Sequence, residues 1–244
     1  MIHLTIDNKP IEVAEGRTLL EACREHGIHI PTLCYHPALE PYGGCRLCVV
    51  EVSMGGRKPR LVASCVYPCE EGAVVQTQSE TVVRSRRITA ELILAGSYHT
   101  PEILALGEEL GVKEVRFKLD EENACVLCGL CVRACNEIVG VSAISVIQRG
   151  IAKKVATPFE VKSSRCIGCG TCVLICPTGA FRFESVAGFQ YVSPKESAYH
   201  LGYYRLGGEL DLRPNFVQDI AGLLSHEPRA AGEPGKQVGD SYDR

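Results

Sequence analysis

The sequence lacks several features that would place the protein in a membrane, outside the cell or on nucleic acid. No apolar run reaches the roughly 18 residues that a membrane-spanning helix needs. Residues 1–7 (MIHLTID) lack the basic stretch and the apolar core of a signal peptide. Positive charge is not in excess, because the formal net charge is −3. We therefore expect a soluble, cytoplasmic protein with no membrane span and no nucleic-acid partner.

Nucleotide-binding and catalytic motifs are also missing. The 244 residues contain neither a G-x-G-x-x-G fingerprint nor a P-loop, so nucleotide chemistry is expected to reside in another chain. No residue stands out as a general acid, a base or a nucleophile, and we predict no catalytic residue. Apolar residues make up 45% and charged residues 23% of the chain, as in a globular protein. A chain of this length can hold two or three small domains.

Cysteine is the residue type that is abundant. Fourteen cysteines occur in the 244 residues, and their spacing is ordered. Secreted disulfide scaffolds are usually short and carry a signal peptide, so they fit this chain poorly. Structural zinc is the other alternative, and the spacing of the cysteines must decide it.

Residues 1–78 are expected to form a small β-rich domain. Apolar residues alternate over residues 2–6, as in a strand that buries one face. Turn chemistry follows at residues 8–10, and a second strand is expected over residues 11–13. The chain therefore opens with a predicted hairpin.

A helix is predicted directly after this hairpin. Thr18 can cap a helix over residues 19–26, and Glu21 stands at the position of a capping-box partner. Gly27 is expected to end the helix. A hairpin, a helix and a cysteine-bearing loop in this order predict a β-grasp domain.

Residues 79–120 carry no cysteine and are expected to form a helical connector. Two helical stretches are separated by Gly96 and Pro101, which interrupt helices. Residues 186–244 form a C-terminal extension that adds apolar residues and is expected to dock a partner or pack on the protein itself. Its last part, residues 226–244, is rich in proline, glycine and charge and is expected to be a mobile tail.

Residues 121–185 carry two copies of the run C-x2-C-x2-C-x3-C, and the second copy follows the first by 41 residues. This is the spacing of bacterial ferredoxins with two 4Fe–4S clusters, in which the fourth cysteine of each run binds the other cluster. The predicted ligands of one 4Fe–4S cluster are Cys125, Cys128, Cys131 and Cys176. Those of the other are Cys135, Cys166, Cys169 and Cys172.

Zinc explains these runs poorly. Zinc sites pair two C-x2-C knuckles, which leaves the spacing of the eight cysteines unexplained. Glycines at positions 129, 168 and 170 are expected to let the loops fold tightly around the clusters. Pro177 follows its run as in ferredoxins, whereas Asn136 stands where the first run would have a proline. This departure leaves the ligands intact but argues mildly against a simple free ferredoxin.

Four further cysteines form the pattern C-x10-C-x2-C-x16-C. Plant-type ferredoxins bind one 2Fe–2S cluster with C-x4-C-x2-C and a distant fourth cysteine, so the first gap is wider here. The predicted 2Fe–2S ligands are Cys34, Cys45, Cys48 and Cys65. Two cysteines remain, of which Cys23 is expected in the core. Cys69 is an alternative fourth ligand, but Cys65 is preferred because residues 61–65 look like a strand end that delivers it.

Several of these segments resemble one family. Residues 31–34 (PTLC), 45–52 (CRLCVVEV) and 63–65 (ASC) resemble the N-terminal 2Fe–2S domain of the large iron–sulfur subunit of respiratory complex I and of iron–iron hydrogenases. Residues 123–140 are similar to the same families. Chain length makes the diaphorase iron–sulfur subunit of NAD(P)-linked nickel–iron hydrogenases the most similar family. The resemblance implies an α+β fold with a β-grasp 2Fe–2S domain, a helical connector and a bacterial-type two 4Fe–4S domain.

The sequence departs from these families in the connector. The relatives place a cluster there with one histidine and three cysteines, spaced H-x3-C-x2-C-x5-C. His99 looks like the histidine of this pattern, but residues 100–111 contain no cysteine. We therefore predict no fourth cluster, and we expect His99 to be a structural or surface residue.

The resemblance implies an electron-transfer subunit of a hetero-oligomer. Single electrons would pass through one 2Fe–2S and two 4Fe–4S clusters, between an NAD(P)H-oxidising flavoprotein and a catalytic subunit such as a hydrogenase. The alternatives are a subunit of an NAD(P)-dependent formate dehydrogenase, a subunit of a bifurcating complex, and a free polyferredoxin. The sequence contains neither a DNA-binding helix nor a basic patch, so nothing in it supports an iron–sulfur sensor or scaffold.

Overall fold

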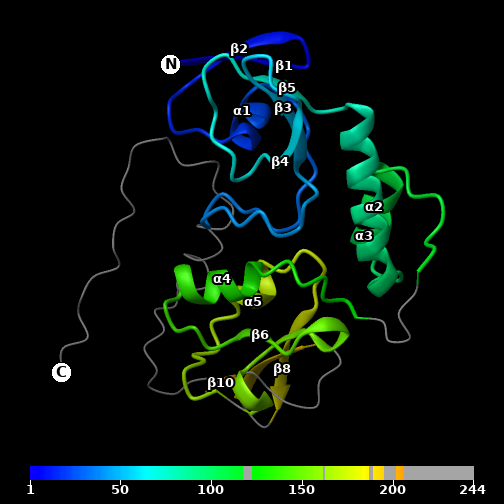
Figure 1. The fold of residues 1–244 in the computed structure, drawn as a ribbon. Coiled ribbons are helices and arrows are strands. Elements are labelled where there is room, and N and C mark those ends of the chain that lie inside the picture. The colour runs from blue at the N-terminus through cyan, green and yellow to red at the C-terminus, as the bar shows by residue number, and fades with distance from the viewer. Residues whose placement is uncertain (118–122, 162, 187–188, 195–201, 206–244) are drawn as a thin grey trace.

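The chain folds into two mixed α+β units that are linked by a pair of helices (Figure 1). The computed structural model describes residues 1–117, 123–161, 163–186, 189–194 and 202–205. The predicted tail, residues 226–244, lies outside the described residues, as does most of the predicted extension. No helix in the described part of the chain is long and apolar enough to cross a membrane.

The N-terminal unit is a five-stranded sheet with one short helix. Its elements are β1 (Ile2–Ile6), β2 (Lys9–Val13), α1 (Leu19–Glu25), β3 (Val49–Ser53), β4 (Arg60–Ala63) and β5 (Val74–Gln76). The strand order is β2-β1-β5-β3-β4, with β1 and β5 parallel and the other neighbours antiparallel. The core beneath α1 contains Leu19, Leu20 and Cys23, all with no exposed area, so Cys23 is a core residue as expected.

The predicted hairpin is confirmed, but its turn lies earlier than predicted. Asp7 and Asn8 form the turn, with φ angles of 47° and 67°. Lys9 and Pro10, which the sequence pattern places in the turn, already pair with β1. Pro10 is tolerated because β2 is the edge strand of the sheet, where a missing N–H donor breaks no ladder.

The predicted cap of α1 is confirmed. The Glu21 N–H donates to Thr18 Oγ1 at 3.3 Å, and the Thr18 N–H donates to Glu21 Oε2 at 2.8 Å. This reciprocal pair satisfies two of the free donors at the start of the helix. The capping box thus fixes the start of α1, the helix that precedes the segment with the first cysteines in the sequence.

The connector contains two helices, α2 (Glu80–Gly96) and α3 (Pro101–Glu109). The break between them falls at the predicted glycine and proline, and Pro101 occupies the first turn of α3, where its missing N–H costs nothing. Glu91 on α2 is 5% exposed and accepts two bonds of 2.7 Å from the Arg116 guanidinium. These bonds lower the pKa of Glu91 to about 2 and hold residues 111–117 beside α2.

The second unit contains two short helices that repeat the same geometry. Gly129, before α4 (Leu130–Glu137), has a φ of 77°, and Gly170, before α5 (Thr171–Leu174), has a φ of 74°. The two glycines stand 41 residues apart, so the sequence repeat extends to the backbone. The remaining elements are β6 (Ser145–Ile147), η1 (Gly150–Ala152), β7 (Lys154–Ala156), η2 (Pro158–Glu160), β8 (Phe181–Val186), β9 (Phe189–Pro194) and β10 (Gly202–Arg205). They form a β6-β7 hairpin and a three-stranded β10-β9-β8 sheet.

A buried arginine joins the connector to the N-terminal sheet. Arg86 on α2 is 3% exposed, and its Nε and Nη2 donate to the Val49 carbonyl at 3.1 and 2.7 Å. The neighbouring strand β5 ends at Gln76, opposite Glu51, and does not reach Val49. Arg86 therefore supplies the donors that the sheet does not.

We predict that replacing this arginine weakens the docking of α2. Arg86→Met leaves the Val49 carbonyl without its donors and should lower the free energy of unfolding by about 2 kcal/mol. The measurement is the urea midpoint of the anaerobic chain, followed by far-ultraviolet circular dichroism. Arg87→Met changes the next, exposed residue of the same helix and should stay within roughly 0.5 kcal/mol. Equal midpoints for the two variants would contradict this role of Arg86.

Candidate iron–sulfur sites

The first cysteine array lies on three loops at one end of the N-terminal sheet. Cys34 lies on the segment after α1, Cys45 and Cys48 precede β3, and Cys65 follows β4. Three of them are only 1% exposed, and Cys45 is half-buried. The structure therefore brings together all four cysteines that were predicted to bind the 2Fe–2S cluster.

The four cysteines of this array fall into two pairs. The Cys45 N–H donates to Cys34 Sγ at 3.3 Å, and the thiol of Cys45 also raises the pKa of the Cys34 thiol. Cys48 Sγ and Cys65 Sγ lie 3.4 Å apart. Two pairs of thiols are the arrangement that a two-iron cluster can use, with two ligands for each iron.

Hydrogen bonding inside each pair separates the pKa values of its two thiols. The bond to Cys34 lowers the pKa of Cys45, and the bond to Cys65 lowers the pKa of Cys48. The same bonds raise the pKa of Cys34 and the pKa of Cys65, with burial adding to the effect. Each pair thus favours one thiolate, which is the form that binds iron.

Cys69, the alternative fourth ligand, belongs to the same core cluster as Cys48 and Cys65, but its contacts are with the segment around α1. Its N–H donates to the Arg17 carbonyl at 2.8 Å, and the side chain is 5% exposed within the core beside α1. Burial raises the pKa of Cys69 to about 11, and the carboxylates of Glu21 and Glu25 add to the shift. Cys65, and not Cys69, contacts Cys48 in the structure.

In the second array, the fourth cysteine of the second run lies with the first run. Burial raises the pKa of Cys131, and negative charge on Cys128, Cys125 and Cys176 raises it further. Burial likewise raises the pKa of Cys128 to about 11, with Cys176 and Cys125 contributing. These thiols are therefore close enough to act on one another.

The fourth cysteine of the first run lies with the second run. A small cavity is lined by Cys135, Cys166, Cys169 and Cys172, together with apolar side chains that include Val139, Val141, Ile144 and Ile167. Four half-buried thiols around an apolar cavity offer the soft ligands that a cubane cluster uses. Cys135 thus lies with the second run, as Cys176 lies with the first.

Backbone donors point at both exchanged cysteines. The Ala143 N–H donates to Cys135 Sγ at 3.3 Å, and the Ala180 N–H donates to Cys176 Sγ at 3.2 Å. Hydrogen bonds to cluster sulfurs stabilise negative charge and thereby tune reduction potentials. The two loops therefore supply equivalent electrostatic support to equivalent positions of the repeat.

Among the described residues, no three histidine, cysteine, aspartate or glutamate side chains lie close enough to hold a single metal ion. In a 4Fe–4S cluster each thiolate binds a different iron, and in a 2Fe–2S cluster the four thiolates are divided between two irons. All fourteen cysteines are described, and none forms a disulfide.

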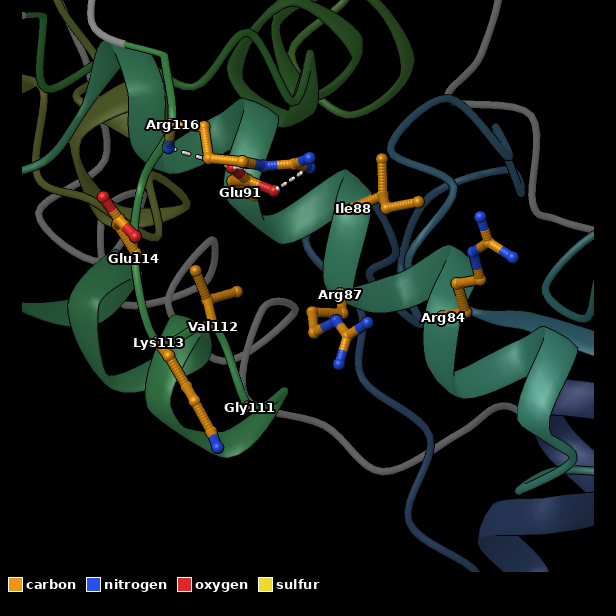
Figure 2. Close-up of a pocket in the computed structure, with 9 residues that line it drawn as sticks. All are labelled: Arg84, Arg87, Ile88, Glu91, Gly111, Val112, Lys113, Glu114 and Arg116. Carbon is orange, nitrogen blue, oxygen red and sulfur yellow. Dashed lines mark hydrogen bonds and ion pairs between the residues drawn. The ribbon is translucent and has the colours of Figure 1, made fainter.

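The connector holds none of these thiols. His99 is exposed, and its ring contacts that of Tyr98 with 4.3 Å between the ring centres. A hollow of about 380 Å³ lies between α2 and residues 111–116 and contains no cysteine (Figure 2). It is lined by Arg84, Arg87, Ile88, Glu91, Gly111, Val112, Lys113, Glu114 and Arg116. The sequence carries no recognisable signal for this hollow, because its basic residues are spread over two segments.

Two family matches cover the two arrays. Residues 1–80 match the 2Fe-2S iron-sulfur cluster binding domain, and residues 124–180 match the 4Fe-4S dicluster domain, which holds two 4Fe–4S clusters. The chain therefore contains one 2Fe–2S and one double 4Fe–4S ferredoxin-type domain, in the predicted order.

Similar proteins occur in several bacteria. The NADPH-Fe(3+) oxidoreductase subunit alpha of Geobacter sulfurreducens is 34% identical over 203 residues, 73% of this chain and 24% of the relative. One of the subunits of an NADH-quinone oxidoreductase of Rhizobium meliloti is 34% identical over 74% of this chain and 24% of its own length. The NADP-reducing hydrogenase subunit HndD of Solidesulfovibrio fructosivorans is 33% identical over 74% of this chain and 36% of its own length. The chain thus spans about a quarter to a third of these relatives.

This chain also matches a chain of a solved structure, and it covers a larger share of that chain than of the relatives above. A chain of the NAD+-reducing [NiFe]-hydrogenase in the H2-reduced state is 33% identical, with a TM-score of 0.56. The match covers 64% of the present chain and 74% of the hydrogenase chain. The protein therefore belongs to the family of iron–sulfur electron-transfer subunits that this hydrogenase chain represents, and it is related to subunits of NADP-reducing hydrogenase and NADH-quinone oxidoreductase.

Proposed function

We propose that this chain relays single electrons between an NAD(P)H-linked flavoprotein and a hydrogenase catalytic subunit. Four segments would divide the work: a β-grasp 2Fe–2S domain at residues 1–78, a helical connector at 79–120, a two 4Fe–4S domain at 121–185 and a partner-docking extension at 186–244. The order β2-β1-β5-β3-β4 with α1 against the sheet supports the β-grasp assignment.

The observation that carries the proposal is the gathering of twelve cysteines in three sets of four. The 2Fe–2S ligands in this proposal are Cys34, Cys45, Cys48 and Cys65. The first 4Fe–4S cluster takes Cys125, Cys128, Cys131 and Cys176, and the second takes Cys135, Cys166, Cys169 and Cys172. The two cysteine pairs, the mutual effects of the thiols and the cysteine-lined cavity support these sets.

When bound, such clusters accept and release one electron each without making or breaking substrate bonds. The chain's own residues bury the thiols, direct backbone N–H groups at sulfur and exclude water. These are electrostatic and packing tasks, and they need no acid, base or nucleophile. The chain is therefore proposed to be a non-catalytic subunit of an oxidoreductase.

The partners follow from the named relatives. The solved relative is part of an enzyme named for NAD+ reduction and nickel–iron hydrogenase activity, and another relative is a subunit of an NADP-reducing hydrogenase. We extend both activities to the complex in which this chain would work. A cytoplasmic location is proposed as well, because fourteen thiols outside any disulfide suit a reducing compartment.

A pair of cysteine variants tests the 2Fe–2S ligand set. Cys65→Ser removes the sulfur that contacts Cys48 and should abolish or strongly alter the 2Fe–2S signal in electron paramagnetic resonance. Cys69→Ser, four residues away, removes a core thiol beside α1 and should retain the signal. The opposite result, with the signal lost only in the Cys69 variant, would overturn the assignment.

Anaerobic purification of the tagged chain from its own host tests the proposed function. We expect a complex that contains a flavoprotein and nickel. Its clusters should be reduced when NAD(P)H is added. Molybdenum or tungsten in place of nickel would replace the hydrogenase by a formate dehydrogenase. A monomer that emerges alone and fully loaded with iron would contradict the subunit proposal and identify a free polyferredoxin.

A further inference from the structure

The wide gap between the first two cysteines of the 2Fe–2S array has a structural role. Ten residues separate Cys34 from Cys45, and the loop that they form, residues 35–44, faces α4 of the second unit (Figure 1). We define this segment as the bridging loop. It makes hydrogen bonds and an apolar contact with the 4Fe–4S domain.

The bridging loop is anchored by one buried apolar side chain. Leu39 is 6% exposed and belongs to the hydrophobic cluster of the second unit, which includes Leu130, Cys131 and Ala134 of α4. An apolar residue of one domain is thus part of the other domain's core, beside a predicted cluster ligand. Such burial favours a fixed arrangement of the two domains.

Arg133 makes the polar contacts of this junction. It lies on α4, and its Nη2 donates to the Cys34 carbonyl at 2.6 Å, while its Nη1 donates to the Glu40 carbonyl. The guanidinium also lies 5.3 Å from the ring centre of Tyr42. One side chain of the 4Fe–4S domain therefore binds the chain at two points, directly before the bridging loop at Cys34 and within it at Glu40.

Two further contacts fix the same loop. The Glu40 N–H donates to Glu137 Oε2, one turn along α4, at 2.9 Å. The exposed ring of Tyr42 packs over Gly44, where a Cβ atom would lie 2.2 Å from its Cε1 and would displace the ring. The bridging loop is therefore held to the second unit at its start, next to Cys34, and at its middle, at Leu39 and Glu40.

Arg133 also lies near a ligand of the other proposed cluster. Its charge acts on the thiol of Cys128, where it opposes the larger effect of burial. Its Nε is buried and has no hydrogen-bond partner among the described residues. A half-buried cation that contacts the backbone of Cys34 and acts on Cys128 lies between ligands of two different clusters.

We propose that Arg133 is the positioning residue that sets the spacing between the 2Fe–2S site and the Cys125–Cys128–Cys131–Cys176 site. This inference rests on the proposed function, since it requires clusters at both sites. The guanidinium locks the bridging loop on α4 and places positive charge where an electron passes between the sites. Both effects favour transfer: the first keeps the distance constant, and the second stabilises the reduced state of either neighbour.

The test compares Arg133→Gln and Arg133→Lys with Arg149→Gln in the iron-loaded full-length chain. Arg149 is an exposed arginine of the same unit, so its replacement matches the change in net charge. The readouts are the magnetic interaction between the reduced clusters in electron paramagnetic resonance and their midpoint potentials. Iron content and the signals of the individual clusters are measured on the same samples.

We expect Arg133→Gln to lose the interaction between the 2Fe–2S and 4Fe–4S signals and to lower both midpoint potentials. Arg133→Lys keeps the charge but cannot reach both carbonyls with a planar fork, so the interaction should weaken while the potentials change less. Arg149→Gln should behave as the unmodified chain. An interaction and potentials that are unchanged in Arg133→Gln would overturn the proposal.

A failure of the proposed function is distinguishable from a failure of this inference. If the unmodified chain lacks either cluster signal, the function fails before Arg133 is tested. If Arg133→Gln does not retain iron, Glu137→Ala removes only the bond to the Glu40 N–H and leaves Arg133 and every thiol in place. Faster hydrogen exchange over residues 35–44 in that variant supports the docking of the loop, and unchanged exchange contradicts it.

Discussion

The rest of this structure depends on bringing cysteine thiols together and covering them, fully or in part, with protein. A buried thiolate is unfavourable unless a metal or a hydrogen-bond donor compensates its charge. The chain meets this constraint with short loops whose glycines adopt left-handed backbone conformations, such as Gly129 and Gly170, and with N–H groups that point at sulfur. The sheet of the N-terminal unit and the repeated helices of the second unit carry these loops.

The parts of the fold that depend on neighbouring residues could be predicted from the sequence. The hairpin, the capping box of Thr18 and the break between α2 and α3 follow from local backbone preferences and are present in the structure. The predicted position of the first turn is wrong because Pro10 favours a turn, whereas an edge strand accepts proline as readily. The parallel pairing of β1 with β5 joins residues about seventy positions apart and leaves no local signal.

In the candidate sites, too, some features could be predicted from the sequence and others could not. The repeat predicts which thiols belong together, because a spacing of x2-x2-x3 is specific, and the structure groups them accordingly. Spacing alone does not separate Cys65 from Cys69, and only the fold places the former against Cys48 and the latter beside α1. Arg86 and Arg133 could not be predicted, because each acts on a backbone carbonyl in another segment. Long-range contacts of this kind have no sequence motif.

The most direct measurement is an anaerobic reductive titration of the intact, iron-loaded chain, followed by electron paramagnetic resonance together with metal analysis. Three clusters require about 10 iron atoms per chain and three one-electron reductions, one with a 2Fe–2S signal and two with 4Fe–4S signals. That result would establish the chain as a three-cluster electron carrier. Zinc in place of iron, or fewer than three reducible centres in a fully loaded chain, would contradict it.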